Sequence, residues 1–359
     1  FLSLGFVPYP FTISNRTDFT DGRIGGLASR TRTTNYSRRR ETTQPVCSGS
    51  SHTIMRNTWN HVRELYKKGG LHTILFLLTI LTTLSAGAFQ SGANPFKTPS
   101  HLIEGIPFSA TLLCILLTHE MGHYVAARWH GVPATLPYFV PGIPLFIGTF
   151  GAVIRMKGPI LEKRALFDIG VSGPIIGFVF AVISIFVGLR YSHVVVVDGL
   201  VGIQLGEPIL FDFLTKIVIG DIPDTYDIVL HPIAFAGWVG LLITALNLIP
   251  IGQLDGGHIA YAMFGERQPM IAATLILPIL FYLGALSILT IVFPWMEVLP
   301  GSPGWQGWII WSLLPLLIGL RHPPVLDTHV PLDSKRRLIG WITIIIFMMS
   351  FVPAPFTNF

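Results

Sequence analysis

Charged residues are scarce in this sequence. Asp, Glu, Lys and Arg make up 12% of its 359 residues, against roughly 25% in an ordinary soluble domain. Hydrophobic residues account for 51%, so a water-facing surface would leave much apolar area exposed. The scarcity of charge argues against a soluble protein and favours one whose apolar surface contacts a lipid bilayer.

Cysteine is also rare. The two cysteines, Cys47 and Cys114, lie far apart, one in a polar N-terminal segment and one in an apolar stretch. This excludes a disulfide framework, and Cys114 is interpreted as a small buried hydrophobe. The sequence likewise lacks a repeat of the solenoid type.

Long apolar stretches are abundant, and several approach the roughly 20 residues that a helix needs to cross a bilayer. They lie near residues 71–89, 103–127, 166–190, 229–250, 270–293, 305–320 and 338–356. The last two are the weakest because they contain prolines. We therefore expect an all-α polytopic membrane protein with six or seven transmembrane helices.

The net charge of +5 raises the question of a nucleic-acid partner. From residue 56 onward, however, Lys and Arg gather in alternate loops. If residues 56–70 are cytoplasmic, the loops on that face carry 14 basic residues and those on the other carry three: Lys97, Arg190 and Lys216. This asymmetry follows the positive-inside rule. Membrane topology therefore explains the charge, and nucleic acid is not an expected partner.

Residues 1–55 differ from the rest of the chain. They are rich in Arg, Ser and Thr, poor in acids, and show no hydrophobic periodicity. We expect disorder there. The composition also suits an organellar transit peptide, and because the chain begins with Phe, an incomplete or mis-started reading frame is a further explanation.

A metal-binding motif lies within the second apolar stretch, in "LLTHEMGHYV" (116–125). On a helix, His119 and His123 share one face, and Glu120 lies beside them, within reach of a water held by the metal. The alternative is a pair of hydrogen-bonded core histidines without metal. That alternative is disfavoured, because ionisable groups inside a membrane are costly.

Catalytic zinc normally takes three protein ligands, so a third should lie at a similar membrane depth. The segment "NLIPIGQLDGGH" (247–258) ends an apolar stretch that reaches the same face of the membrane. Its Asp255 can meet the two histidines, and the glycines that follow allow the chain to bend and approach closely. His258 is a rival ligand by residue type. Spacing favours Asp255 and leaves His258 open.

Together, HExxH and N-x-x-P-x-x-x-x-D-G resemble the motifs of the site-2 protease family of intramembrane zinc metalloproteases. The stretch between them begins with "GVSGPIIGF" (170–178), which is similar to the glycine-rich middle helix of that family. Gly173 and Gly177 form a GxxxG pattern, which most often permits close helix packing and need not mark a dimer. The resemblance covers residues 103–260.

The resemblance implies that His119, His123 and Asp255 bind Zn²⁺, that Glu120 is the catalytic acid and base, and that Asn247 helps to hold the substrate. It also implies a three-helix catalytic core. We divide the chain accordingly into residues 1–55, a first span with flanks at 56–100, the catalytic core at 101–260, and C-terminal transmembrane helices at 261–359.

Residues 136–158 are apolar but interrupted by Pro137, Pro141 and Pro144, which disfavours a spanning helix. We expect a re-entrant loop or a short hairpin. A helical substrate must unwind before water can attack it, and the strand-like portion Thr149–Met156 is suited to pair with the unwound backbone. The alternative is that this segment only plugs the cavity.

The sequence thus predicts an intramembrane zinc endopeptidase that cleaves membrane-anchored, membrane-spanning proteins near the cytoplasmic or stromal face. The bilayer would be a bacterial inner membrane or, alternatively, a chloroplast membrane. One competing function is a catalytically silent membrane chaperone or scaffold, against which the intact HExxH and LDG motifs argue. Another is a metal transporter, which should place ionisable residues at several depths, whereas here they gather at one.

Overall fold

The computed structural model describes residues 50–196, 204–223, 225–293, 304–320, 322, 325, 327 and 330–357. Its contacts divide into two units, residues 7–69 and a larger unit that includes residues 70–359. The site lies entirely in the larger unit. Of the segment expected to be disordered, residues 1–49 lie outside the described residues, and residues 50–55 begin the first helix.

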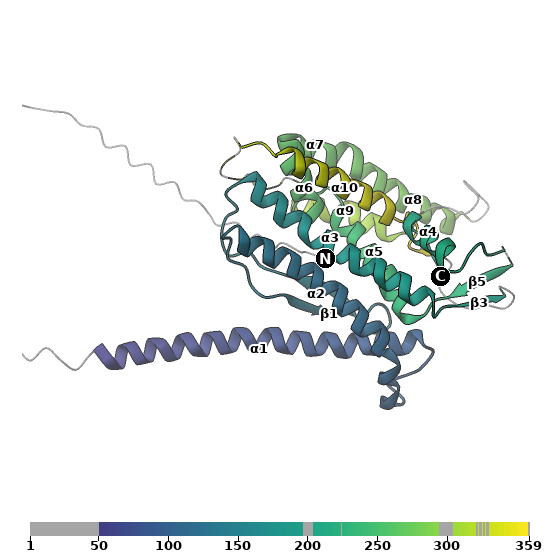
Figure 1. The fold of residues 1–359 in the computed structure, drawn as a ribbon, viewed down its shortest axis with the longest axis horizontal. Helices are drawn as coiled ribbons and strands as arrows, with labels where there is room; N and C mark the ends of the chain where they lie inside the picture. The colour runs from purple at the N-terminus through teal and green to yellow at the C-terminus, as the bar shows by residue number, and fades with distance from the viewer. Residues whose placement is uncertain are drawn as a thin grey trace, which may run out of the picture. The chain divides into compact units, whose positions relative to one another are not determined.

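Helices make up most of the structure (Figure 1). They are α1 (Ser50–Gln90), α2 (Ile106–Trp129), α3 (Lys163–Leu189), α4 (Ile209–Val218), α5 (Pro232–Leu248), α6 (Asp255–Phe264), α7 (Gln268–Ile271), α8 (Leu277–Val292), α9 (Gly307–Ile318) and α10 (Ser334–Ser350). The strands are β1 (Tyr138–Pro141), β2 (Thr149–Val153), β3 (His193–Val196), β4 (Gln204–Leu205), β5 (Tyr226–Val229) and β6 (Phe356–Thr357).

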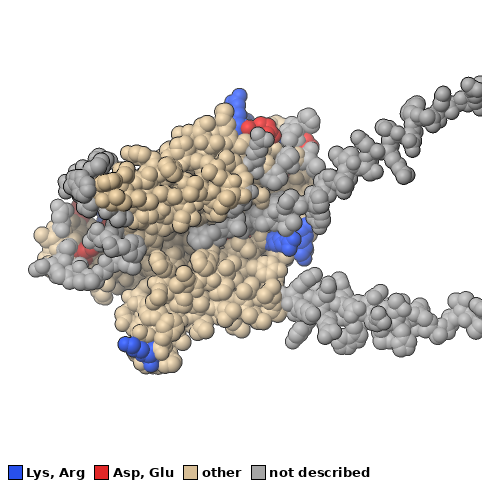
Figure 2. Space-filling model, turned by 180° about the vertical axis from the view of Figure 1, so that it is seen from behind, with Lys and Arg blue, Asp and Glu red and all other residues tan. Residues whose placement is uncertain are grey.

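Four helical segments of the described chain are long and apolar enough to span a membrane. They are Gly70–Gln90, Pro99–Trp129, Lys163–Leu189 and Asp255–Leu289. Apolar side chains are exposed along them, and the face seen in Figure 2 has a wide uncharged area with charged residues near its edges. The predicted all-α membrane fold is thereby confirmed.

The other predicted spans correspond to shorter helices. The stretch 229–250 forms α5, with 17 residues, and the stretch 305–320 forms α9, with 12 residues and Pro315 inside it. Most of the stretch 338–356 lies in α10, with 17 residues. At 1.5 Å per residue α5 is only about 26 Å long. Nearly all its side chains are buried against other helices, so neighbouring helices shield it from lipid.

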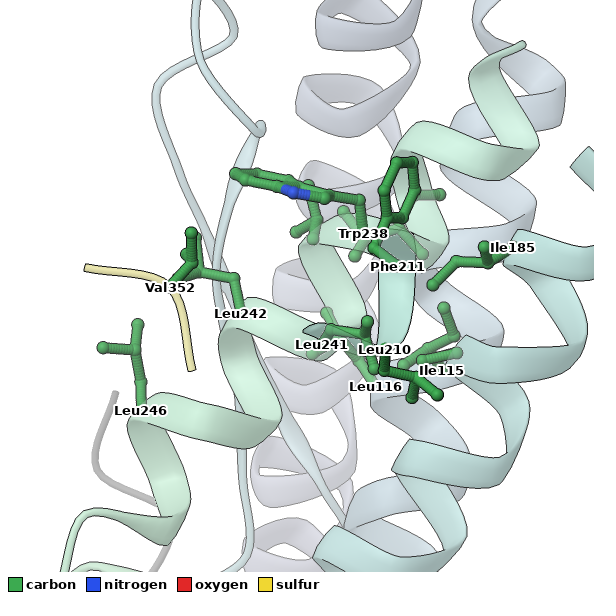
Figure 3. Close-up of a cluster of buried hydrophobic side chains, with 14 of the residues drawn as sticks. Ile115, Leu116, Ile185, Leu210, Phe211, Trp238, Leu241, Leu242, Leu246 and Val352 are labelled. Carbon is green, nitrogen blue, oxygen red and sulfur yellow. The ribbon is translucent and has the colours of Figure 1, made fainter. Parts of the chain in front are cut away.

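Helices α2, α3 and α5 pack against one another and form the core of the larger unit. Glycines allow the close approach: a Cβ on Gly188 of α3 would lie 2.1 Å from the backbone nitrogen of Ala234 on α5. Figure 3 shows Ile115, Ile185 and Leu241 in the cluster between these helices. This packing fixes the relative positions of α2, α3 and α5, on which the site depends.

Strands β1 and β2 form the short hairpin that the prolines predicted. They are antiparallel, with Tyr138 opposite Val153. The hairpin packs on the membrane-spanning part of α1, where the rings of Phe76 and Phe139 lie 4.8 Å apart. A Cβ on Gly148 would lie 2.4 Å from the carbonyl oxygen of Thr82, so the loop of the hairpin touches the helix backbone.

An ion-pair network joins the ends of three helices. Asp168, near the start of α3, accepts hydrogen bonds from Nε and Nη2 of Arg336 on α10, at 2.8 and 2.6 Å. Its Oδ2 also lies 2.8 Å from Nε2 of His130, which follows α2. A bidentate guanidinium contact of this kind has a defined geometry. It anchors α10 to the core.

Candidate metal centre

The HExxH residues lie in the second half of α2. His119, Glu120 and His123 are each at most 3% exposed. One helical turn separates the two histidines, so their rings lie on the same face and their Nε2 atoms are 3.1 Å apart. The helix therefore presents two nitrogen atoms that could bind one metal ion.

Asp255, the first residue of α6, completes the group. Its Oδ2 lies 3.3 Å from Nε2 of His119 and 3.3 Å from Nε2 of His123, and Asp255 is fully buried. Ligand atoms about 2.05 Å from a tetrahedral zinc ion are about 3.3 Å from one another. The three separations therefore fit a zinc ion without further movement.

A hydrogen bond to α3 fixes the orientation of the His123 ring. Its Nδ1 lies 2.7 Å from the carbonyl oxygen of Ile169 on α3. A carbonyl can only accept, so Nδ1 carries the proton and Nε2 is left with its lone pair. A histidine held in this way is prepared to ligate through Nε2.

The glycine pattern of α3 accommodates both imidazoles. A Cβ on Gly173 would lie 2.1 Å from Nε2 of His123, and one on Gly177 would lie 3.0 Å from Nδ1 of His119. The GxxxG pattern predicted close packing, but not that histidine rings would be the packing partners. In the sequence, the signal for this role was the position of the GxxxG pattern between the HExxH motif and the segment that contains Asp255.

The turn before α6 brings Asp255 to the histidines. Gly252 has a φ of +51°, in the left-handed region that favours glycine. Gly256 and Gly257 are required for a different reason: a Cβ would lie 2.0 Å from the oxygen of Leu248 in the first case and 2.4 Å from the oxygen of Gly252 in the second. The two glycines after Asp255 thus provide room rather than an unusual backbone conformation.

Glu120 lies beside the candidate metal centre and is hydrogen-bonded to the residue that follows the hairpin. Its carboxylate accepts a hydrogen bond from the backbone N–H of Ile154, the residue after β2. Its Oε2 is buried and has no hydrogen-bond partner among the described residues. A buried carboxylate oxygen without a partner is costly in a folded protein. A water beside a metal ion would satisfy it.

A pocket opens next to these residues. It lies between α2, β2 and α5, and its lining includes His119, Glu120, Phe150, Ala152 and Asn247. The side-chain Nδ2 of Asn247 is 3.4 Å from Nε2 of His119. Asn247 and β2 therefore both line an apolar pocket that reaches the HExxH motif.

His258, the rival ligand, points elsewhere. Its Nδ1 lies 2.5 Å from Nε2 of His322, a residue between α9 and α10. Within the described part of the chain, a single group of three or more metal-ligating side chains is found, and it consists of His119, His123 and Asp255. The geometry thus brings together the three residues that the resemblance implied.

A helix carrying HExxH that meets a carboxylate from a later helix, in an apolar helical bundle, is typical of membrane metalloproteases. Comparison with known families agrees: residues 107–291 match the model of peptidase family M50. The match covers more than half of the chain. The chain belongs to this family, and the resemblance to site-2 proteases is confirmed.

Curated relatives carry corresponding names. "Probable zinc metalloprotease EGY2, chloroplastic" of Arabidopsis thaliana is 33% identical over 201 residues, which are 54% of this chain and 35% of that protein. "Probable zinc metalloprotease EGY1, chloroplastic" of the same plant is 28% identical over 306 residues, 78% of this chain and 52% of that protein. This chain thus spans about half, or less, of the length of these relatives. No solved structure matches it.

Proposed function

We propose that this protein is an intramembrane zinc endopeptidase that hydrolyses peptide bonds of membrane-anchored proteins. The observation that carries the proposal is the convergence of His119, His123 and Asp255 beside the buried Oε2 of Glu120. The relatives are named zinc metalloproteases. Membership of the family and the spacing of the ligand atoms both support zinc as the metal.

In this proposal His119, His123 and Asp255 hold the metal and Glu120 transfers the proton. Zinc in such a site acts as a Lewis acid, which makes water more acidic and polarises a carbonyl. Glu120 accepts a proton from the attacking water and delivers it to the leaving amine nitrogen. The hydrogen bond from Ile154 holds the carboxylate in place. Oε2, which has no hydrogen-bond partner among the described residues, is then available to accept the proton.

The pocket supplies a place for an extended substrate segment. A spanning helix occupies its own carbonyls in hydrogen bonds, so it must unwind locally before attack. Strand β2 is paired with β1 on one edge, and its residues Thr149 to Ala152 line the pocket. We propose that β2 pairs with the unwound backbone and that the Asn247 amide donates to a substrate carbonyl.

The relatives favour one of the two membranes that the sequence left open. Their names place them in the chloroplast. We therefore propose a chloroplast membrane, with cleavage near the stromal face, in preference to a bacterial inner membrane. The lipid bilayer is then a partner by way of the exposed apolar side chains, and membrane-spanning proteins are the substrates.

The test is cleavage of tagged single-span proteins by the detergent-purified chain, with zinc content measured in parallel. Wild type is compared with Glu120→Gln and Asp255→Ala. Glu120→Gln should retain zinc and lose cleavage, because the amide is isosteric but cannot accept the proton. Asp255→Ala should lose both. Asp212→Asn, a change on the exposed surface of α4, serves as the control and should behave as wild type.

The same variants separate the alternatives. A scaffold would keep partner binding, and a transporter would keep zinc flux into vesicles, in Glu120→Gln. Cleavage that survives the loss of Glu120, or a wild-type protein without zinc, would overturn the proposal.

A further inference from the structure

A second pair of buried histidines lies near the metal centre and is not part of it. His258 on α6 is fully buried, and His322 is 8% exposed. The distance of 2.5 Å between His258 Nδ1 and His322 Nε2 requires that one nitrogen donates and the other accepts. The ring of His322 also stacks on Tyr261, with centroids 4.7 Å apart.

His322 is the hydrogen-bond partner that orients His258. Within the described residues, the other ring nitrogen of His258, Nε2, is buried and makes no hydrogen bond. On its other side His258 meets α3, where a Cβ on Gly170 would lie 3.0 Å from the Cβ of His258. His258 is therefore held between a helix of the catalytic core and His322.

The position of His258 connects it to the metal centre. It lies three residues after Asp255 on the same short helix, so both side chains are on one side of α6. The backbone N–H of His258 donates to the carbonyl of Leu254, at 3.0 Å, which closes the first turn of the helix. Any rotation of this turn moves the Asp255 carboxylate relative to His119 and His123.

Described residues before and after His322 in the chain contact the surroundings of Asp255. Before His322, a Cβ on Gly252 would lie 2.5 Å from the carbonyl oxygen of Gly319. Farther along, the N–H of Val325 donates to the Tyr261 hydroxyl, and the N–H of Asp327 donates to the carbonyl of Leu161, at 2.8 Å. Gly319, Val325 and Asp327 thus contact, in turn, the turn before α6, α6 itself and the segment that leads into α3.

We propose that His322 is a positioning residue for the zinc site: through its hydrogen bond to His258, it holds the first turn of α6 so that Asp255 meets His119 and His123. The inference rests on the proposed zinc site. His322 lies beyond residues 107–291, the part that matches the family model. A segment outside that region would therefore set the geometry of the third ligand.

The experiment measures the zinc dissociation constant of the full chain in detergent by competition with a chelator. The variants are His322→Ala, His258→Ala, the double variant and His322→Gln. Loss of a group that orients a metal ligand typically weakens binding 10-fold to 100-fold, so His322→Ala should bind zinc about tenfold more weakly. His322→Gln should recover most of the affinity, because its amide can replace Nε2. His193→Ala, an exposed histidine on β3, should bind as wild type.

Two further measurements test whether His322 acts by positioning the zinc site. The absorption spectrum of the cobalt-substituted protein should change in His322→Ala and return in His322→Gln, because the bands report ligand geometry. The double variant should bind zinc no more weakly than the single variant with the lower affinity, since His258 and His322 act through one contact. Unchanged affinity and spectrum in His322→Ala would overturn the inference and leave the zinc site standing. A wild-type chain that binds no zinc would overturn the proposed function as well.

Discussion

A Cβ atom on Gly173 of α3 would lie 2.1 Å from Nε2 of His123 on α2. No side chain other than the hydrogen atom of glycine fits between the backbone of α3 and this nitrogen. The carbonyl oxygen of Ile169, one turn earlier on α3, lies 2.7 Å from Nδ1 of the same ring. The backbone of α3 therefore positions His123 on both sides, by a hydrogen bond and by the absence of a side chain.

Gly173→Ala should displace His123 and abolish zinc binding. The added methyl group forces either the ring or the two helices apart, and overpacking of this kind costs about 1–3 kcal/mol. Zinc content after dialysis and thermal unfolding should both fall. Gly70→Ala is the matched control, since nothing lies within 4 Å of a Cβ there. Full zinc occupancy in Gly173→Ala would mean that His123 does not bind through Nε2.

Asn247→Ala should lower kcat/KM and leave zinc bound. The amide lines the pocket, and the loss of one hydrogen bond to a substrate carbonyl costs about 1–1.5 kcal/mol, or roughly tenfold. Thr244→Ala is the control one turn earlier on α5, because the Thr244 hydroxyl donates to its own helix at Gly240. A purely structural Asn247 would instead reduce the folded fraction and the zinc content together.

Ala152→Pro should lower turnover more than it lowers protein level. Proline removes a backbone N–H from β2, the strand that lines the pocket. If β2 pairs with the unwound substrate, we expect roughly tenfold slower cleavage. Ile143→Pro, in the exposed loop of the hairpin, controls for the introduction of proline. Equal turnover in the two variants would favour a hairpin that only plugs the cavity.

The sequence predicted the elements of the candidate site because each carries its signal locally. HExxH marks one helix face, and the prolines of residues 136–158 exclude a helix where the hairpin forms. Helix lengths were less predictable. The stretch 229–250 is predominantly apolar, and only its burial among neighbouring helices reveals α5 as a short central helix.

The meeting of Asp255 with His119 and His123 could be predicted from their motifs, but contacts between distant residues that belong to no motif could not. His258 and His322 are 64 residues apart, and no periodicity relates an isolated histidine in a connection to one on a helix. His258 could therefore be recognised only as a metal-ligating residue type, and its partner was not identified. Likewise, the sequence shows that Gly173 is small but not that an imidazole occupies the space.

The stability of α10 should depend on pH through Asp333. This residue caps α10, and its Oδ1 accepts a hydrogen bond from the backbone N–H of Arg336, at 2.8 Å. That bond, followed by the nearby guanidinium group of Arg336, lowers the pKa of Asp333 from its ordinary value of 3.8. Because the folded-state pKa is the lower one, the stabilising effect is complete well above 3.8 and is lost as the pH falls through the folded-state pKa.

The prediction is a loss of thermal stability in acid that depends on the charge of Asp333. Asparagine and serine also cap helices but do not titrate. The difference in Tm between wild type and Asp333→Asn should therefore shrink between about pH 6 and pH 3, and Asp333→Ser should show the same pH trend relative to wild type. A Tm difference that is constant over this range would show that the cap stabilises α10 without its charge.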